Sequence, residues 1–144
     1  MTVFYLGINL LEASLFGLFF WQISNQSRAR KGIAFVFYSV LHFLLMSYIN
    51  RTEIMAGYRS LIFYMLAYIC LSIGSDFSAE GKLFFSLIPD LITAVINTYL
   101  LIAASYFMFG RIEILFLLEQ YGVIVTLISK PLQLLALHCA AAAV

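Results

Sequence analysis

Five apolar stretches, each about as long as a bilayer is thick, fill almost all of this chain. They span residues 2–23, 32–49, 58–74, 83–109 and 123–144. A helix needs about 20 apolar residues to cross the hydrocarbon core of a membrane. Because backbone polar groups in lipid must find partners within their own segment, each stretch predicts a helix. The fold class expected is therefore all-α, a polytopic membrane bundle with about five transmembrane helices.

The composition excludes a soluble protein. Hydrophobic residues make up 64% of the chain, charged residues 10%, and the mean hydropathy is +1.02, values that ordinary soluble domains do not show. The polar segments 24–31, 50–59 and 75–82 are too short to bury a core of their own. Residues 1–144 are thus expected to form one domain whose first partner is membrane lipid. A nucleic-acid-binding role is not expected.

The distribution of cations predicts the orientation of the bundle. The first apolar stretch has no Lys or Arg before it, and it is followed directly by Arg28, Arg30 and Lys31. Positive residues near a membrane helix stay in the cytoplasm. The N-terminus is therefore expected outside. In that orientation segments 50–59 and 110–122 face outward, and segments 24–31 and 75–82 face the cytoplasm.

The last third of the chain leaves two interpretations open. Residues 112–118 are apolar but too few to cross a membrane before the polar segment 119–122. They could form an interfacial helix, or the start of one long tilted helix. We expect an interfacial helix over 112–118 that leads into a membrane helix over 123–144.

Three charged residues, Glu12, Asp90 and Lys130, fall inside apolar stretches. Each such charge costs about 2.5–3.5 kcal/mol on insertion scales and marks a functional position by default. At 1.5 Å per residue, Glu12 lies ~15 Å and Lys130 ~10 Å from the outer face, whereas Asp90 lies ~20 Å from it. Glu12 and Lys130 are therefore expected to pair, and Asp90 to meet a water, a hydroxyl group or the inner interface.

The function of these charges has several explanations. Glu12 and Lys130 could neutralise each other as a packing contact, or either could face a ligand. Alternatively, Glu12 is protonated, or Lys130 reaches the interface without a partner. His42 and His138 lie on separate helices with no Cys, Asp or Glu at ligand spacing, so no metal site and no cofactor are expected.

Several short motifs resemble a known family. In chain order they are Asn9–Glu12 followed by the basic segment, Gly81–Phe85 opening the fourth helix, Phe109-Gly110 closing it, and Tyr121 leading to Ser129-Lys130. This order is similar to the polytopic membrane sensor region of GHKL-type bacterial sensor histidine kinases, which include the Agr-like peptide receptors. Pro131 departs from the pattern, since an apolar residue is expected after the lysine.

The resemblance implies a function. The chain would be the signal-sensing region of a two-component histidine kinase in the bacterial cytoplasmic membrane. It would detect an extracellular signal, such as a secreted peptide, and pass the change to a cytoplasmic kinase that this chain does not contain. The region itself is therefore not expected to be an enzyme. Kinase dimers imply a homodimer.

In the outward-N orientation, signal recognition is expected on the outer side. Binding residues concentrate on loops held by a rigid scaffold. Cationic side chains there could meet a carboxylate or backbone carbonyl groups, and tyrosine rings could contact the ligand. The outer-face candidates are Arg51, Tyr58, Arg59, Arg111 and Tyr121.

Two other classes of protein remain as alternatives. The first is a small transporter or transporter subunit, with Glu12, Asp90 and Lys130 along a substrate path. Broken helices and inverted repeats would support it; Pro89 and Pro131 hint at the former, and no repeat is visible. The second is a structural or assembly protein without a ligand.

The orientation is testable by cysteine accessibility in intact cells. In a background lacking Cys70 and Cys139, Thr52→Cys should react with a membrane-impermeant thiol reagent, and Ser27→Cys should react only after permeabilisation. The reason is that cations flank the cytoplasmic end of a helix. Labelling of Ser27→Cys alone in intact cells would invert the topology.

Overall fold

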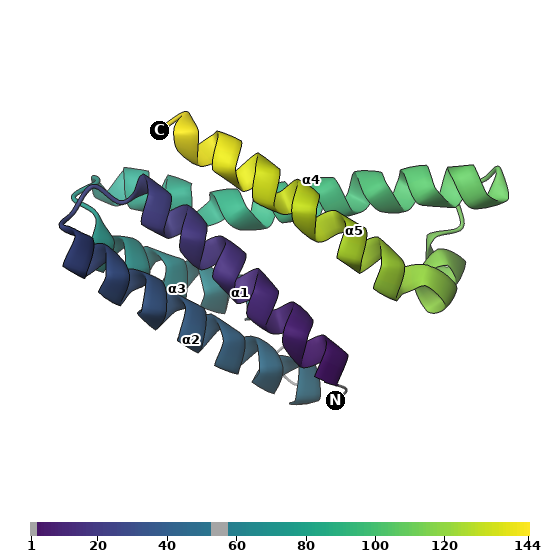
Figure 1. Ribbon diagram of the computed structural model, residues 1–144, viewed down its shortest axis with the longest axis horizontal. Coiled ribbons are helices and arrows are strands. Elements are labelled where there is room, and N and C mark those ends of the chain that lie inside the picture. The colour runs from purple at the N-terminus through teal and green to yellow at the C-terminus, as the bar shows by residue number, and fades with distance from the viewer. Residues whose placement is uncertain (1–2, 53–57) are drawn as a thin grey trace.

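The computed structural model describes residues 3–52 and 58–144, and it forms a bundle of five helices (Figure 1). The helices are α1 (Val3–Ile23), α2 (Arg28–Thr52), α3 (Arg59–Gly74), α4 (Ala79–Phe109) and α5 (Ile114–Ala142). Side chains are described throughout these helices except at Arg51, Thr52, Leu115, Phe116, Glu119 and Gln120. All regular structure in the described part is helical, as the sequence predicts.

The helices form a closed ring. Each helix contacts the next one along the chain, and α1 also contacts α5, so that the first and last helices are neighbours. The turns after α1 and α3 lie at the end of the bundle where the C-terminus also lies, and α4 ends at the opposite end (Figure 1). A chain with five successive helices arranged this way has its two termini on opposite sides.

Four of the helices are long and apolar enough to cross a membrane: α1, α2, α4 and the Tyr121–Ala142 part of α5. α3 is shorter. Its 16 residues span ~24 Å at 1.5 Å per residue, less than the ~30 Å of a hydrocarbon core. By the same rise the 31 residues of α4 span ~46 Å. The short α3 therefore lies beside a much longer α4.

Two helices begin earlier than the apolar pattern predicts. α2 begins at Arg28 and α4 at Ala79, each four residues before the boundaries expected at 32 and 83. In α4 the reason is visible, because the Ser78 side chain accepts a hydrogen bond of 3.2 Å from the Gly81 amide, which caps the free end of the helix. The apolar run marks the lipid-embedded part of a helix, whereas polar first turns extend beyond it.

The expectation of a separate interfacial helix over 112–118 is wrong. α5 runs without a break from Ile114 to Ala142, so the alternative of one long helix is the correct one. The polar segment 119–122 contains good helix formers such as Glu119 and Gln120, and Gly122 costs only about 1 kcal/mol in a helix. Gly110, at φ 67°, instead provides the chain reversal after α4.

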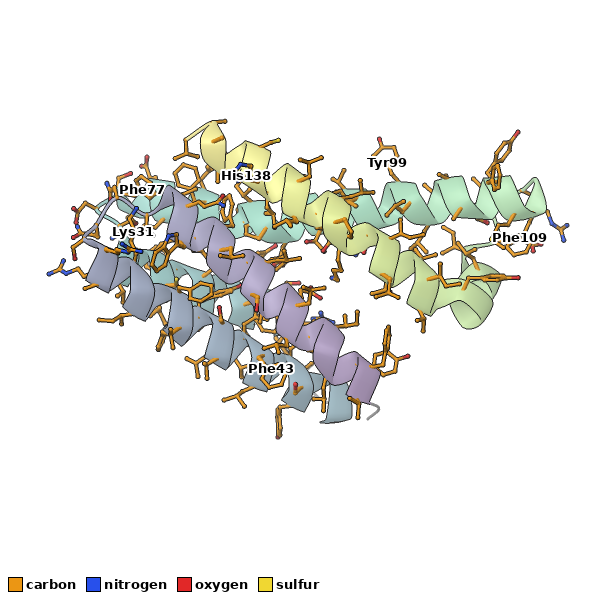
Figure 2. All side chains as sticks on the ribbon, in the orientation of Figure 1. Lys31, Phe43, Phe77, Tyr99, Phe109 and His138 are labelled. Carbon is orange, nitrogen blue, oxygen red and sulfur yellow. The ribbon has the colours of Figure 1, made fainter. Side chains whose placement is uncertain are left out.

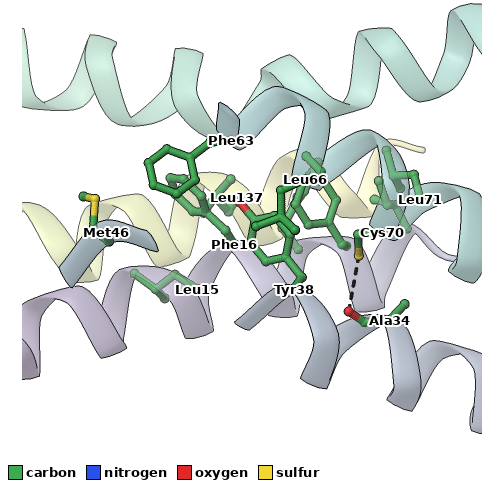
Figure 3. Packing of buried hydrophobic residues seen from close by; sticks show 14 of the residues in the cluster. Leu15, Phe16, Ala34, Tyr38, Met46, Phe63, Leu66, Cys70, Leu71 and Leu137 are labelled. Atoms are coloured by element: carbon green, nitrogen blue, oxygen red, sulfur yellow. Dashed lines mark hydrogen bonds between the residues drawn. The ribbon is translucent and has the colours of Figure 1, made fainter. Parts of the chain in front are cut away.

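Large side chains of α1, α2 and α3 form the hydrophobic core (Figure 3). Phe16 and Phe20 of α1 pack against α2, where the ring of Phe20 lies 4.8 Å from that of Tyr38. Leu137 brings α5 into the same cluster. By contrast, the buried residues of α4 are the small Ser86, Pro89 and Ser105, and Tyr99 points away from the other helices (Figure 2). α4 thus lies at the periphery of the bundle.

α1 and α2 approach closely at Gly17. A Cβ atom at this position would overlap Ser39 Oγ and lie 3.0 Å from the Phe35 ring. One turn earlier on α1, the Ala13 carbonyl accepts a hydrogen bond of 3.4 Å from Ser39 Oγ. Small residues spaced four apart allow such approach between membrane helices. The sequence shows the spacing of Ala13 and Gly17, and the structure identifies α2 as the partner.

Replacing Gly17 with leucine should destabilise the bundle, because the side chain has no space at the α1–α2 contact. Overpacking of this kind costs about 1–3 kcal/mol, which should appear as a lower midpoint of thermal unfolding in detergent. Gly7→Leu in the same helix is the matched control, since nothing lies within 4 Å of its Cβ position. Equal midpoints for the two variants would contradict the close approach.

Candidate functional site

A cavity of about 810 Å³ lies inside the ring, lined by α1, α3, α4 and α5. Its volume is within the range of about 300–1,000 Å³ that small-molecule sites occupy. It lies where α3 begins, at Arg59 and Ser60, beside the longer α4. The polar residues of its lining are Glu12, Arg59, Ser60, Tyr64, Asp90, Thr93, Asn97, Thr126, Ser129 and Lys130.

An ion pair joins the first and last helices at this cavity. Lys130 Nζ lies 3.2 Å from Glu12 Oε2, and the two side chains are 7% and 13% exposed. The pairing expected from their estimated depths is therefore present. Because both groups are almost fully removed from solvent, each is costly without the other.

Amide and hydroxyl groups extend the ion pair into a network that links α4 with α5. Lys130 Nζ also donates to Gln133 Oε1 at 3.2 Å. Gln133 Nε2 in turn donates to Asn97 Oδ1 at 2.9 Å and to Ser129 Oγ at 3.3 Å. Gln133 and Ser129 are buried. The network thus holds the Lys130 ammonium group in place from its own helix and from α4.

Asp90 and Arg59 face the same cavity as the ion pair. Within the described residues, neither side chain makes a salt bridge or a side-chain hydrogen bond, although the Arg59 guanidinium carbon lies 6.0 Å from the centre of the Phe63 ring. The depth estimate separates Asp90 from Glu12 and Lys130, whereas the structure brings all three to one cavity. The depth estimate counts residues along each helix as if the helix were perpendicular to the membrane. It therefore leaves out the tilt with which α4 and α5 cross the other helices.

A second cavity of about 430 Å³ extends the polar interior toward the N-terminal end of α1. It shares Ile8, Glu12, Arg59, Leu118 and Thr126 with the larger cavity. Its lining continues past these residues to Phe4 and Tyr5, in the first turns of α1. The polar interior therefore runs from the start of α1 to the middle of the bundle.

The outer-face candidates are dispersed. Arg59 lines both cavities. Tyr58 is exposed, Tyr121 is half-buried within α5, and Arg111 pairs with Glu113 at 2.6 Å in the turn between α4 and α5. The Arg51 side chain lies outside the described residues. Of the described candidates, the structure brings Arg59 alone into the polar interior.

The histidines and cysteines do not gather into a metal site. His42 is buried, with its ring stacked at 4.3 Å on Phe63 and its Nδ1 2.9 Å from the Tyr38 hydroxyl oxygen. His138 and Cys139 are exposed. No group of three or more His, Cys, Asp or Glu side chains in the described part of the chain could hold a metal ion.

The chemistry of the cavity suits a ligand that carries charge. Glu12, Asp90, Arg59 and Lys130 provide two groups of each sign, and an internal ion pair neutralises one of each. The Thr93 hydroxyl oxygen is buried at the lining without a hydrogen-bond partner among the described atoms. Buried polar atoms normally have partners, so this hydroxyl adds an unsatisfied polar group to the wall of the cavity.

The chain matches no protein-family model, no curated protein and no solved structure.

The ion pair should behave as a coupled unit in a double-mutant cycle. Glu12→Gln or Lys130→Met alone leaves a buried charge without its partner, which costs about 3–5 kcal/mol. The double variant removes both charges and should be more stable than the sum of the single losses predicts. Unfolding measured in detergent at one pH for all four proteins tests this, and additive losses would exclude an energetic coupling.

Proposed function

We propose that this chain is the ligand-sensing membrane region of a two-component sensor histidine kinase in a bacterial cytoplasmic membrane. The observation that carries the proposal is the charged cavity inside the helical ring. Intramembrane charges are costly and are retained where they serve a function. Arg59 and Asp90 line this cavity without an ion pair in the described part of the molecule, as expected of groups that bind a ligand. The resemblance of its motifs to those of GHKL-type sensors supports the assignment to a sensor histidine kinase.

In the outward-N orientation, the ligand reaches the cavity from outside the cell. The smaller cavity extends to Phe4 and Tyr5 in the first turns of α1, which would face outward. A secreted peptide terminus or another small charged molecule would enter there and reach Glu12 and Arg59, the two charged residues that line both cavities. Recognition would then depend on the interior of the bundle more than on its outer loops.

Binding would be transmitted through α5. The Glu12–Lys130 pair connects α1 to α5, and a charged ligand beside it competes for the same groups. A change in this contact alters the position of α5, through which the signal would pass toward the kinase that the resemblance implies. A ligand shifts an equilibrium only by its difference in affinity for the two states, and an exchange of ion-pair partners provides that difference.

The transporter alternative has less support. α4 and α5 continue through Pro89 and Pro131, so the broken helices common in secondary transporters are absent from the described residues at both positions. A purely structural role does not explain why Asp90 and Arg59 face a cavity. For these reasons the sensing function is the one proposed.

Kinase activity of the full-length protein in membrane vesicles tests this function. With ATP present, histidine phosphorylation should respond to medium conditioned by the source organism, relative to fresh medium. Asp90→Asn and Arg59→Gln should require at least tenfold more conditioned medium, since a lost charged hydrogen bond is worth about 1.5–3 kcal/mol. Arg111→Gln is the matched control, because Arg111 is exposed and outside the cavity.

Two outcomes would contradict the sensing function. One is that the protein encoded by the full native reading frame shows no histidine phosphorylation in this assay. The other is a response in which Asp90→Asn and Arg59→Gln both match the wild-type protein.

A further inference from the structure

An apolar groove of about 620 Å³ lies between α3 and α4 on the outside of the ring. Its walls are aliphatic and aromatic side chains, several of which are more than half exposed, such as Leu61, Met65 and Leu83. An exposed apolar face is ordinary for a membrane helix. A hollow in that face is different, because lipid chains do not cover it as they cover a convex surface.

The groove adjoins the charged cavity. Tyr64 of α3 and Leu87 of α4 line both spaces, so these two side chains form the boundary between them. Arg59 and Asp90 lie on the cavity side of that boundary, and Met65 and Leu83 lie on the groove side. An apolar space on the outside of the bundle is therefore separated from a charged space inside it by Tyr64 and Leu87.

We infer that the site also takes a single-chain zwitterionic amphiphile, which enters from the bilayer between α3 and α4, a second route beside the outer one proposed above for a soluble signal. Its hydrocarbon chain would lie in the groove, where it removes apolar surface from a poorly filled space. Its head group would pass Tyr64 and Leu87 into the cavity. There an anionic group on the ligand meets Arg59, whose planar guanidinium suits phosphate or carboxylate, and an ammonium group meets Asp90.

The charges select this class of head group. A purely anionic head would leave Asp90 facing a like charge, and a purely cationic head would do the same to Arg59. A neutral sugar head would leave both partly buried charges without partners, which is costly. A head group with one charge of each sign satisfies both Asp90 and Arg59. This inference rests on the cavity being the ligand site, as proposed above, but not on the presence of a kinase.

Native mass spectrometry of the purified chain in a non-ionic detergent tests the inference without any kinase. The probe is palmitoyl lysophosphatidylethanolamine, which has one chain and a zwitterionic head. We expect one molecule retained per chain, with an apparent affinity at least tenfold higher than for palmitoyl lysophosphatidylglycerol, which has the same chain and no ammonium group. Phosphoethanolamine, the head without a chain, should not be retained.

Substitutions test separately what the groove and the cavity contribute to lipid binding. Leu87→Trp should fill the boundary, and Met65→Trp the groove, and each should lower retention of the zwitterionic lipid at least tenfold. Both positions are exposed, so neither change disturbs the core. Leu44→Trp on the exposed face of α2 is the matched control. Asp90→Asn should remove the preference over the anionic lipid while retaining binding of the chain.

Equal retention of the zwitterionic and anionic lipids by the wild-type protein would overturn the inference. So would unchanged binding in both tryptophan variants, because the lipid would then occupy the general surface of the bundle. Neither outcome bears on whether Asp90→Asn and Arg59→Gln weaken the kinase response. Conversely, if both variants respond like the wild-type kinase while lipid binding is as expected, the sensing function is contradicted and this inference is not.

Discussion

The buried ion pair between Glu12 and Lys130 is the contact on which the arrangement of the bundle depends. It joins the first helix to the last across the interior, and it closes a ring in which each helix also contacts the next one along the chain. Neither charge is tolerable alone in a low-dielectric interior. The pair therefore specifies which face of α5 meets α1, a choice that uniform apolar faces leave open.

The short third helix explains why the ring encloses a space. α3 begins at Arg59 and has about half the length of α4, so in the described structure α3 lies beside only part of α4. Polar side chains of these helices line the resulting cavity. The same mismatch places the apolar groove and the charged cavity on the two sides of Tyr64 and Leu87.

Packing differs between the two halves of the molecule. Aromatic side chains fill the core between α1, α2 and α3. By contrast, the fully buried residues of α4 are small, its apolar contacts with the core are only partly buried, and it makes polar contacts with α5, such as Gln133 with Asn97. Regions with few buried apolar contacts open at lower free energy than a packed core. A core centred on α1, α2 and α3, with α5 joined to α1 and α4 through polar contacts, suits the proposed sensing function, in which α5 carries the output.

The sequence by itself determined the helical membrane architecture, because the length of an apolar run and the need to satisfy backbone groups in lipid are local properties. It also predicted the stop at Gly110 and, as the favoured of several alternatives, the pairing of Glu12 with Lys130, since approximate depth follows from residue count; the structure shows that pair. Only the tertiary structure decided that α5 continues through residues 119–122 and that Asp90 and Arg59 share a cavity with the pair. Those features depend on helix tilt, on the rotation of each helix and on the short span of α3, which are set by side-chain packing between segments distant in the chain.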